Sequence, residues 1–396
     1  MLTLDKVFEA QTVLKGIIRE TNAVRSYGIA PDCELYLKPE NLQITGSFKV
    51  RGSAYKIAML SEEEKARGVI ACSAGNHAQG VALAAAKNGI RSLICLPDSA
   101  PISKVEATKG FGAEVCLVEG CYDDAYAKAL ELKEQEGYTF VHPFDDENVI
   151  AGQGTIALEI LNELDNIDAI VVPVGGGGLI SGIAYTVKQI RPAVKVYGVQ
   201  VSGAPSMYNS VQHGAVECLP SVSTIADGIA VKQPGENTYA LVSEYVDELA
   251  LVTDDEVASA ILALIEKQKM IAEGAGAAAV AAVMFRKFDL AGKRVVAVVS
   301  GGNIDVTSLS RVIDRGLRNS GRSTSLLIEL IDKPGQLKEI SRIIADCGGN
   351  VTGVHYEKGH TESVNGCFLR IEMETRDYEH VHQITQTLQN EGFKLL

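Results

Sequence analysis

The chain has 396 residues, and 46% of them are apolar. One compact core rarely holds so long a chain, so we expect two or three domains. The composition is typical of a globular α/β enzyme rather than of a disordered or fibrous chain. Acidic residues outnumber basic ones by 50 to 37. A surface with this excess should repel nucleic acid and anionic membranes, so neither is an expected partner.

The N-terminal residues 1–6 lack both the basic start and the apolar stretch of an export signal. The most apolar stretches, such as residues 274–284, are too short or too rich in Gly and Ala to span a bilayer. We therefore expect a cytoplasmic protein. The 8 cysteines and 7 histidines show no metal-ligand spacing, which predicts reduced thiols and no catalytic metal.

The segment Thr45-Gly46-Ser47-Phe48-Lys49-Val50-Arg51-Gly52 places a single lysine at the start of a helix expected over residues 48–60. Burial and the positive end of the helix dipole both favour the neutral form of such an amine. A neutral lysine can form a Schiff base. A surface lysine at a helix start is the commoner case, so the reactive interpretation of Lys49 depends on the motifs that follow it in the chain.

After residue 68, short apolar runs alternate with helical patterns, which is typical of a parallel sheet built from βαβ units. The first series has strands at residues 69–72, 92–96, 114–118 and 139–141 and helices at 78–88, 102–111 and 122–135. The second has strands at 169–174, 195–201, 249–252 and 294–299 and helices at 152–164, 179–190, 255–267 and 273–288. The two series predict two open α/β lobes with a cleft between them, where loops at the carboxyl ends of strands bind ligands.

Residues 316–325 are rich in Gly, Arg, Asn and Ser and are interpreted as a linker. Beyond them we expect strands at 325–330, 350–357 and 366–373, helices at 336–346 and 378–390, and a short last strand at 393–396. This order is the ferredoxin-like arrangement and should fold as its own unit. We therefore predict a catalytic domain over residues 1–320, with a small lobe at about 51–144, and a separate domain over residues 325–396.

Three glycine loops follow predicted strands, and the first two directly precede predicted helices. Ser73-Ala74-Gly75-Asn76-His77 offers backbone N–H groups at a helix start, which suits a carboxylate or phosphate. Gly175-Gly176-Gly177-Gly178-Leu179 has four consecutive glycines, which a structural turn seldom uses, so a phosphate cradle explains it better. It lacks the spacing of dinucleotide and P-loop motifs, which favours a single phosphate monoester. Ser300-Gly301-Gly302-Asn303 places a hydroxyl where it can bond a ring nitrogen.

A lysine suited to a Schiff base, a phosphate cradle and an anion-binding loop together indicate pyridoxal 5'-phosphate as the cofactor. The four motifs, in this order, resemble those of the threonine ammonia-lyase (threonine dehydratase) family of fold type II pyridoxal phosphate enzymes. The resemblance covers the chain up to about Asn319. It implies two open α/β lobes of the tryptophan synthase beta-like class.

The resemblance also implies a role for each motif residue. Lys49 is the catalytic residue that holds the cofactor covalently, Phe48 lies against the cofactor ring, and Asn76 bonds the 3-oxygen of the ring. The phosphate is held by backbone N–H groups of Gly175, Gly176, Gly177, Gly178 and Leu179. Ser300 faces the pyridine nitrogen. The substrate carboxylate is gripped by Ser73, Ala74, Gly75, Asn76 and His77.

The tail from Ser325 resembles a single ACT domain, a small regulatory fold that commonly binds amino acids at its interfaces. Its turn Asp332-Lys333-Pro334-Gly335-Gln336-Leu337 matches the usual effector-site turn, which implies Asp332, Gly335 and Leu337 as effector residues. The resemblance further implies a homo-oligomer, either a tetramer or a dimer. Isoleucine, valine and other small ligands stay open as effectors, and so does the choice between isoleucine biosynthesis and amino-acid breakdown.

These features predict the deamination of L-threonine to 2-oxobutanoate and ammonia by α,β-elimination of water, with L-serine as a second substrate. The nearest alternative is a serine racemase/serine dehydratase, and the serine racemase family shares almost every motif. That family has a serine where this chain has Ala74, and residues 200–206 lack the carboxylates of its metal site. Cysteine synthase, threonine synthase and a non-catalytic amino-acid-sensing protein are further alternatives. Two interpretations stay open for residues 142–146, a structural turn or part of the substrate pocket. Two also stay open for Glu273, a carboxylate that stabilises a helix start or one that approaches the substrate.

Overall fold

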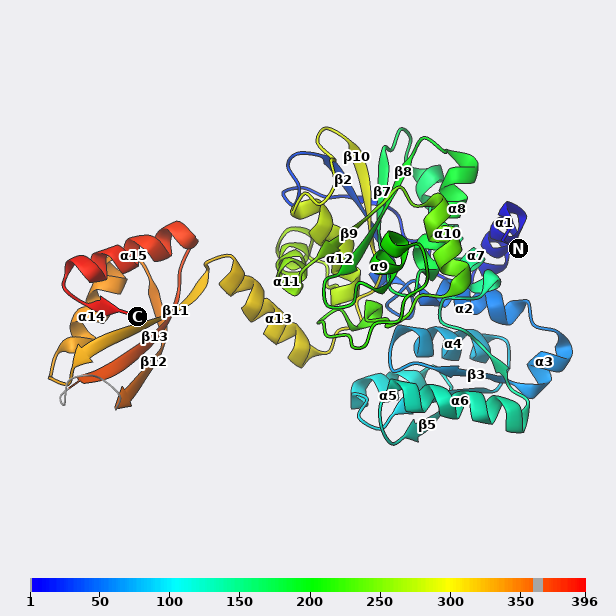
Figure 1. Ribbon diagram of the computed structural model, residues 1–396, viewed down its shortest axis with the longest axis horizontal. Helices are drawn as coiled ribbons and strands as arrows, with labels where there is room; N and C mark the ends of the chain where they lie inside the picture. Colours follow the sequence, from blue (N-terminus) through cyan, green and yellow to red (C-terminus); the bar gives the residue numbers. More distant parts are fainter. Residues whose placement is uncertain (1, 359–365) are drawn as a thin grey trace. The chain divides into compact units, whose positions relative to one another are not determined.

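The computed structural model describes residues 2–358 and 366–396. The chain divides into two compact units, Met1–Leu309 and Ser310–Leu396, and Figure 1 shows the elements of each. Each unit has its own buried apolar core. Among the helices of the described residues, none is both long and apolar enough to cross a membrane.

The first unit contains a six-stranded and a four-stranded sheet, one in each lobe. The larger has the order β1-β2-β10-β7-β8-β9, and β1 is its antiparallel strand. Its strands are β1 (Val24–Arg25), β2 (Glu34–Pro39), β7 (Ala169–Pro173), β8 (Lys195–Val201), β9 (Glu248–Val252) and β10 (Arg294–Val299). The smaller is parallel throughout, in the order β5-β4-β3-β6. Its strands are β3 (Val69–Cys72), β4 (Ser92–Pro97), β5 (Glu114–Val118) and β6 (Thr139–Phe140). The predicted strands of both lobes are confirmed.

The sequence analysis missed β1 and β2, which extend the large sheet beyond β10. In β2 the apolar Leu35 and Leu37 alternate with Glu34, Tyr36 and Lys38, and yet Lys38 is fully buried as well. A lysine is almost never fully buried unless it is paired. The strand therefore depends on ionic partners that the sequence pattern did not show.

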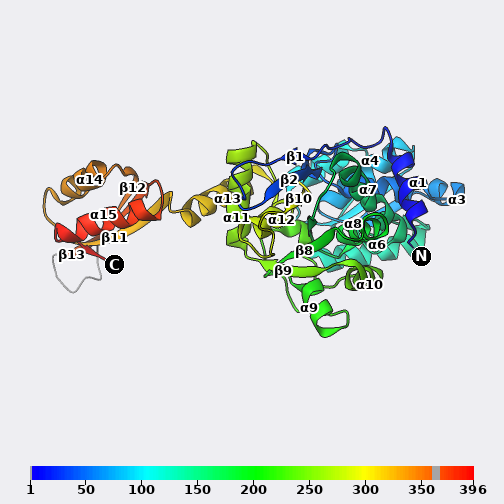
Figure 2. The same ribbon diagram turned by 90° about the horizontal axis from the view of Figure 1, so that it is seen from above.

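Helices cover the sheets of the first unit. The ones that matter for the cleft are α2 (Lys49–Ala58), α4 (Asn76–Lys87), α5 (Ile102–Gly110), α6 (Tyr122–Glu136), α7 (Glu147–Glu163), α8 (Gly178–Ile190) and α12 (Gly274–Met284). The others are α1 (Leu4–Leu14), α3 (Glu62–Arg67), α9 (Ser206–His213), α10 (Glu236–Tyr245) and α11 (Asp254–Ala263), with short helical turns at Glu40–Leu42 (η1), Asp227–Ile229 (η2) and Leu264–Gln268 (η3). Both α8 and α12 pack against strands of the large sheet, as Figure 2 shows from above. Four of these helices, α1, α3, α9 and α10, were not predicted.

The lysine-bearing helix α2 lies where the two lobes meet and packs against α4 of the small lobe and α7. The approach to α7 is close because both helices present glycine at the crossing. A Cβ added to Gly152 would lie 2.7 Å from the Cα of Gly52. The start of α2 is therefore held by backbone-to-backbone packing as well as by side chains.

The second unit contains β11 (Ser323–Ile331), α14 (Gln336–Asp346), β12 (Asn350–Lys358), β13 (Gly366–Glu374), α15 (Tyr378–Asn390) and β14 (Lys394–Leu395). Its sheet has the antiparallel order β12-β13-β11-β14. The predicted succession of strands and helices is confirmed, and the order matches the ferredoxin-like arrangement. Residues 359–365, between two of the predicted strands, lie outside the described residues.

The predicted linker over residues 316–325 is wrong for most of its length. Helix α13 (Val306–Asn319) continues through the first part, with Gly316 buried in it, and β11 already begins at Ser323. Glycine lowers helix propensity by only about 1 kcal/mol. Burial of the face of α13 that carries Val312 and Gly316 outweighs this cost.

Candidate active site

A cavity of about 1040 Å³ lies between the two lobes of the first unit. Its wall includes the loops that follow β3, β7 and β10, where a parallel sheet usually binds ligands. All the residues predicted to serve catalysis, cofactor and substrate line it: Phe48, Lys49, Ser73, Ala74, Gly75, Asn76, His77, Gly175, Gly176, Gly177, Gly178, Leu179 and Ser300. The residues predicted for an effector lie in the second unit, at the turn before α14.

Lys49 is the first residue of α2 and extends its amine into this cavity. Protein encloses the rest of the side chain, and this burial lowers the pKa of Lys49 to about 8, although the negative charge of Glu273 acts in the opposite direction. The amine donates a hydrogen bond of 2.7 Å to the carbonyl of Pro143. A lysine with this pKa has a substantial neutral fraction near pH 8 and can act as a nucleophile or a base.

The segment before Lys49 is tied to the loop that follows β10. Ser47 forms an antiparallel bridge with Gly301, and the N–H of Phe48 donates to the carbonyl of Ser300 over 3.1 Å. Gly46 has a φ of +70°, and a Cβ there would collide with the side chain of Asn303. These contacts set the position of Lys49 relative to Ser300.

The turn after β6 directs a carbonyl at the lysine. His142 Nδ1 accepts hydrogen bonds from the N–H groups of Phe144 (3.3 Å) and Asp145 (2.7 Å). This folds the turn so that the Pro143 carbonyl points to Lys49 Nζ. Residues 142–145 therefore fit both interpretations given above. They line the cavity, and the hydrogen bonds to His142 stabilise the turn.

Asn76 lies in a chain of hydrogen-bonded polar side chains at the cavity. Its Nδ2 donates to Glu273 Oε1 over 2.6 Å, and its Oδ1 accepts from Asn303 Nδ2 over 2.7 Å. Asn303 also donates to the carbonyl of Thr45 at 2.7 Å. Because both ends of the amide have partners, the orientation of Asn76 is fixed.

Glu273, at the N-cap of α12, is almost fully buried and lines the cavity. Burial, followed by the negative charge of Asp227, raises the pKa of Glu273 to about 7. The sequence analysis left its role undecided, because a carboxylate at a helix start is favourable in any case. A buried carboxyl that titrates near neutral pH inside a cavity is a common property of functional sites.

His77 remains neutral because burial lowers its pKa to about 3. Its Nε2 donates to the carbonyl of Val141 over 2.8 Å. The other ring nitrogen, Nδ1, is buried and has no hydrogen-bond partner among the residues that the structure describes. At the start of α4, the backbone N–H groups beside His77 are suited to an anion.

The four-glycine loop forms the start of α8. Gly177, its N-cap, has a φ of +99°, a conformation that favours glycine. A Cβ on Gly176 would lie 2.4 Å from the ring of Phe144, and one on Gly178 would lie 2.8 Å from the Phe144 carbonyl. Side chains are thus excluded, and the first N–H groups of the helix, which have no intrahelical acceptor, remain available to an anion.

Two ion pairs link the lobes at the cavity. Lys104 on α5 contacts Asp227 on η2 at 2.6 Å, and Asp123 on α6 contacts Lys232 at 2.7 Å. The loop around these acidic and basic partners, residues 218–235, contributes much of the cavity wall. The sequence analysis missed this loop because it has little regular structure and no periodic pattern.

Comparison with known proteins agrees with this geometry. A family model described as pyridoxal-phosphate dependent enzyme matches residues 14–301. The chain therefore belongs to the family of pyridoxal-phosphate dependent enzymes. The L-threonine ammonia-lyase of Thermotoga maritima is 48% identical over 398 residues, which cover 100% of this chain and 99% of that protein.

Solved structures give the same result for the fold. Threonine deaminase isoform 2 from Solanum lycopersicum matches with a TM-score of 0.75 and 38% identity, covering 78% of this chain and 88% of that one. Maize serine racemase matches with a TM-score of 0.75 and 33% identity, covering 80% and 98%. The predicted α/β fold type II class and the predicted cofactor, pyridoxal phosphate, are confirmed.

The residues of the cavity fit this cofactor. Its aldehyde requires an accessible amine of lowered pKa, which Lys49 offers, and its phosphate requires a helix N-terminus without side chains, which the loop before α8 offers. Ser300, at the end of β10, is buried and lines the cavity, and its Oγ donates only a long bond of 3.4 Å to the Ala275 carbonyl. Its hydroxyl is therefore available to a ligand.

The raised pKa of Glu273 predicts a pH-dependent contribution to stability. Its pKa is about 7 in the folded chain against an ordinary 4.5, so the stabilising contribution is complete below about pH 4.5 and is lost as the pH rises through 7. Glu273→Gln stays neutral throughout. By urea unfolding, we expect this variant to be more stable than the parent at pH 8, by up to about 3 kcal/mol, with the difference shrinking towards pH 5.

Glu62 offers a matched control, because its side chain is 90% exposed. Glu62→Gln should not show this trend. Parallel curves of stability against pH for Glu273→Gln and the parent would show that the pKa of Glu273 is the same in the folded and unfolded chain, which would contradict the raised pKa.

Proposed function

We propose that this enzyme deaminates L-threonine to 2-oxobutanoate and ammonia by α,β-elimination of water, and that it also accepts L-serine. The observation that carries the proposal is the buried amine of Lys49 between an anion-binding loop at α4 and a glycine cradle at α8. The 48% identity to an L-threonine ammonia-lyase over the whole chain supports the choice of substrate.

Each predicted residue keeps its proposed role. Lys49 holds the cofactor covalently, and the backbone of Gly175 through Leu179 binds its phosphate. Phe48 lies against the ring, Asn76 bonds the ring oxygen through its fixed amide, and Ser300 faces the ring nitrogen. The loop from Ser73 to His77 binds the substrate carboxylate at the start of α4. Bound pyridoxal phosphate supplies a conjugated system that takes up the negative charge developing at the substrate α-carbon.

Lys49 is the group that moves the proton. Once the substrate amine had replaced Lys49 on the cofactor, the Lys49 amine would be free, and with a pKa of about 8 it would accept the α-proton of the substrate. The Pro143 carbonyl would orient the amine for that transfer. Loss of the β-hydroxyl as water then gives an enamine, which water hydrolyses to the 2-oxo acid and ammonia. A hydroxyl at Ser300 cannot supply a negative charge to the ring nitrogen, so it favours rapid elimination over slower carbanion chemistry.

Serine racemase is the nearest competing function, and maize serine racemase matches the fold as well as threonine deaminase does. Racemisation requires a second acid or base on the opposite face of the α-carbon. The racemase family has a serine at the position of Ala74, and Ala74 lines the cavity with a methyl group. A methyl group cannot exchange a proton, so we favour the lyase.

The test of the proposed function is a direct assay of both reactions. We expect 2-oxobutanoate from L-threonine and pyruvate from L-serine, with racemisation of serine much slower than either elimination. Ala74→Ser should raise the rate of racemisation, because it restores a hydroxyl at this wall. If the parent racemises serine rapidly and forms no 2-oxobutanoate, the proposed function is wrong.

We further propose that residues 1–320 form the catalytic domain, with a small lobe at about 51–144, and that residues 325–396 form an ACT domain which binds an amino-acid effector. The ferredoxin-like order of the second unit supports this assignment. At the proposed effector turn, Gly335 has a φ of +94° and caps α14, Leu337 is 40% exposed, and Asp332 accepts a hydrogen bond from Tyr356 at 3.5 Å.

The effector site can be tested by calorimetric titration with isoleucine and with valine, alongside the rate of 2-oxobutanoate formation. Leu337→Glu places a charge in the proposed site, so we expect effector binding to weaken by at least about tenfold, or 1.4 kcal/mol, while the rate without effector stays the same. Leu396→Glu, at an exposed residue away from the turn, is the control. Unchanged effector binding in Leu337→Glu would refute the site.

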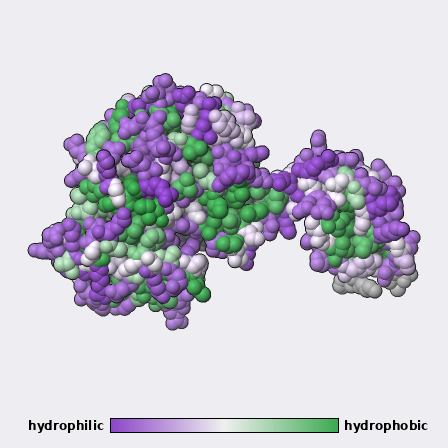
Figure 3. All heavy atoms as spheres, turned by 180° about the vertical axis from the view of Figure 1, so that it is seen from behind, coloured by the Kyte–Doolittle hydropathy of each residue, from purple (hydrophilic) through white to green (hydrophobic). Residues whose placement is uncertain are grey.

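We also propose that the chain forms a homo-oligomer, either a dimer or a tetramer. Figure 3 shows areas of apolar surface on the face it presents, and several large apolar side chains are exposed, among them Ile102 (80%) and Ile271 (52%). Apolar patches on soluble proteins often mark interfaces. Sedimentation equilibrium should give two or four times the chain mass of 42.2 kDa, and a single chain mass would contradict the proposal.

A further inference from the structure

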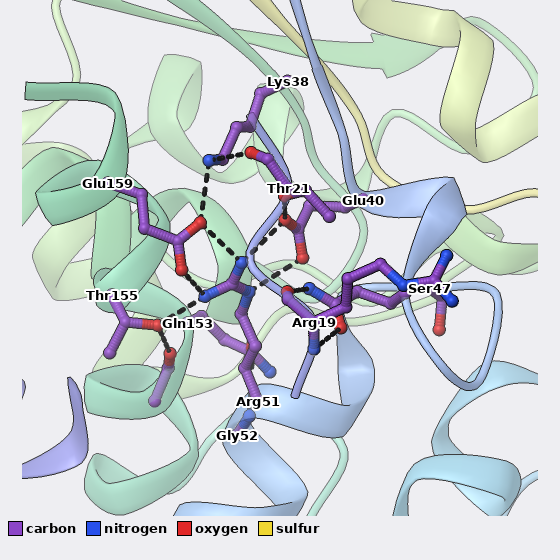
Figure 4. Close-up of polar contacts among 12 residues, drawn as sticks. Arg19, Thr21, Lys38, Glu40, Ser47, Arg51, Gly52, Gln153, Thr155 and Glu159 are labelled. Atoms are coloured by element: carbon purple, nitrogen blue, oxygen red, sulfur yellow. Dashed lines mark hydrogen bonds and ion pairs between the residues drawn. The ribbon is translucent and has the colours of Figure 1, made fainter. Parts of the chain in front are cut away.

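A cluster of buried charges lies directly beside the start of α2 (Figure 4). Its members are Thr21, Lys38, Glu40, Arg51, Thr155, Glu159 and Glu163, and we call them the Arg51 cluster. Arg51, Glu40 and Lys38 are fully buried. None of these residues lines the cavity, so the proposed chemistry does not use them directly.

Arg51 uses all its hydrogen-bonding capacity in this cluster. Nε and Nη2 each donate to Glu40 over 2.8 Å. Nη1 and Nη2 donate to the two oxygens of Glu159 over 2.5 and 2.8 Å, and Nη1 also donates to Thr155 Oγ1 at 3.1 Å. A guanidinium has five N–H donors in a rigid plane, and all five have partners here.

The partners of Arg51 are themselves held in place. Thr21 Oγ1 donates to Glu40 over 2.5 Å, and Lys38 lies 2.7 Å from Glu159. Lys38 and the next residue pair with Val298 and Val299 of β10, and Ser300 follows directly. The cluster therefore joins α2 to η1, to α7 and to the strand pair that leads to Ser300.

Close ion pairing explains why the cluster can be buried. Burial alone would lower the pKa of Arg51, but the charges and hydrogen bonds of Glu40 and Glu159 raise it above its usual value. Two bidentate carboxylate contacts on one guanidinium are strong and directional. Stability alone does not account for such a cluster, because well-packed apolar residues in place of a buried ion pair are often equally stable or more so.

We propose that Arg51 is a positioning residue for Lys49. The two residues lie in the first turn of α2, two positions apart, so a rotation or shift of that turn moves both. Arg51 grips carboxylates on η1 and α7 and thereby fixes the Lys49 amine beside the Pro143 carbonyl and at its set place relative to Ser300. This inference rests on the proposed role of Lys49 in holding the cofactor.

Three variants of the holoenzyme test this role. Arg51→Lys keeps the charge but loses the planar fork. The double variant Arg51→Met with Glu40→Leu removes one positive and one negative charge, so the net charge of the cluster is unchanged. Lys56→Met is the matched control, because it breaks another ion pair, Lys56 on α2 to Asp146 at the N-cap of α7, at 2.7 Å. Lys56 lies about one and a half turns beyond Arg51 along α2.

The measurements are the pH titration of the visible absorption of bound cofactor, kcat and KM for threonine, and urea unfolding. In both Arg51 variants we expect the titration midpoint to move by about one pH unit and kcat to fall by about tenfold to a hundredfold, with KM nearly unchanged. The control should match the parent in all these respects. The double variant covers the case in which Arg51→Lys fails to fold.

Two outcomes overturn the inference. If the Arg51 variants keep the midpoint and kcat of the parent and change only in unfolding free energy, Arg51 serves structure alone. If the parent itself shows no visible absorption and no covalently bound cofactor, the proposed function fails, and the inference fails with it. A shifted midpoint in the Arg51 variants, but not in Lys56→Met, supports the positioning role.

Discussion

Desolvation of one amine is the constraint on which the rest of the site depends. Lys49 Nζ lies in a cavity between two lobes, and its hydrogen-bond partner there is a neutral carbonyl rather than a carboxylate. Burial without an adjacent counter-charge lowers its pKa to about 8. The fold therefore has to hold that amine away from bulk water and away from acidic partners, and still leave it open to a ligand.

A comparison with a second buried lysine shows how the surroundings decide the outcome. Lys38 is more deeply buried than Lys49, but two carboxylates lie near its Nζ, Glu159 at 2.7 Å and Glu163 at 3.3 Å. It serves as part of an ionic cluster of two cations and three carboxylates. The same cluster includes Arg51, which shares a helical turn with Lys49. One region of the fold thus gathers its opposite charges together, and the neighbouring region keeps its amine without a paired carboxylate.

Local signals in the sequence predicted much of this arrangement. The apolar runs of the parallel sheets and the three glycine loops were evident, and they led to Lys49 and to every cavity residue proposed for cofactor and substrate. What the sequence did not show depends on contacts between distant residues. The charged Lys38 interrupts the apolar pattern of β2, so the strand was not predicted. The role of Glu273 was left undecided because its raised pKa comes from burial and from the charge of Asp227. Loop 218–235 has no periodic pattern. The linker prediction failed because it was based on composition alone, which does not reveal the buried face of α13.

The central claim is that one ε-amino group binds the cofactor covalently. The most direct test is reduction of the purified protein with borohydride, followed by proteolysis and mass analysis of the peptides. This account predicts a pyridoxyl group on Lys49 and on no other residue, with loss of the visible absorption. A pyridoxyl group on a different side chain, or on none, would contradict it.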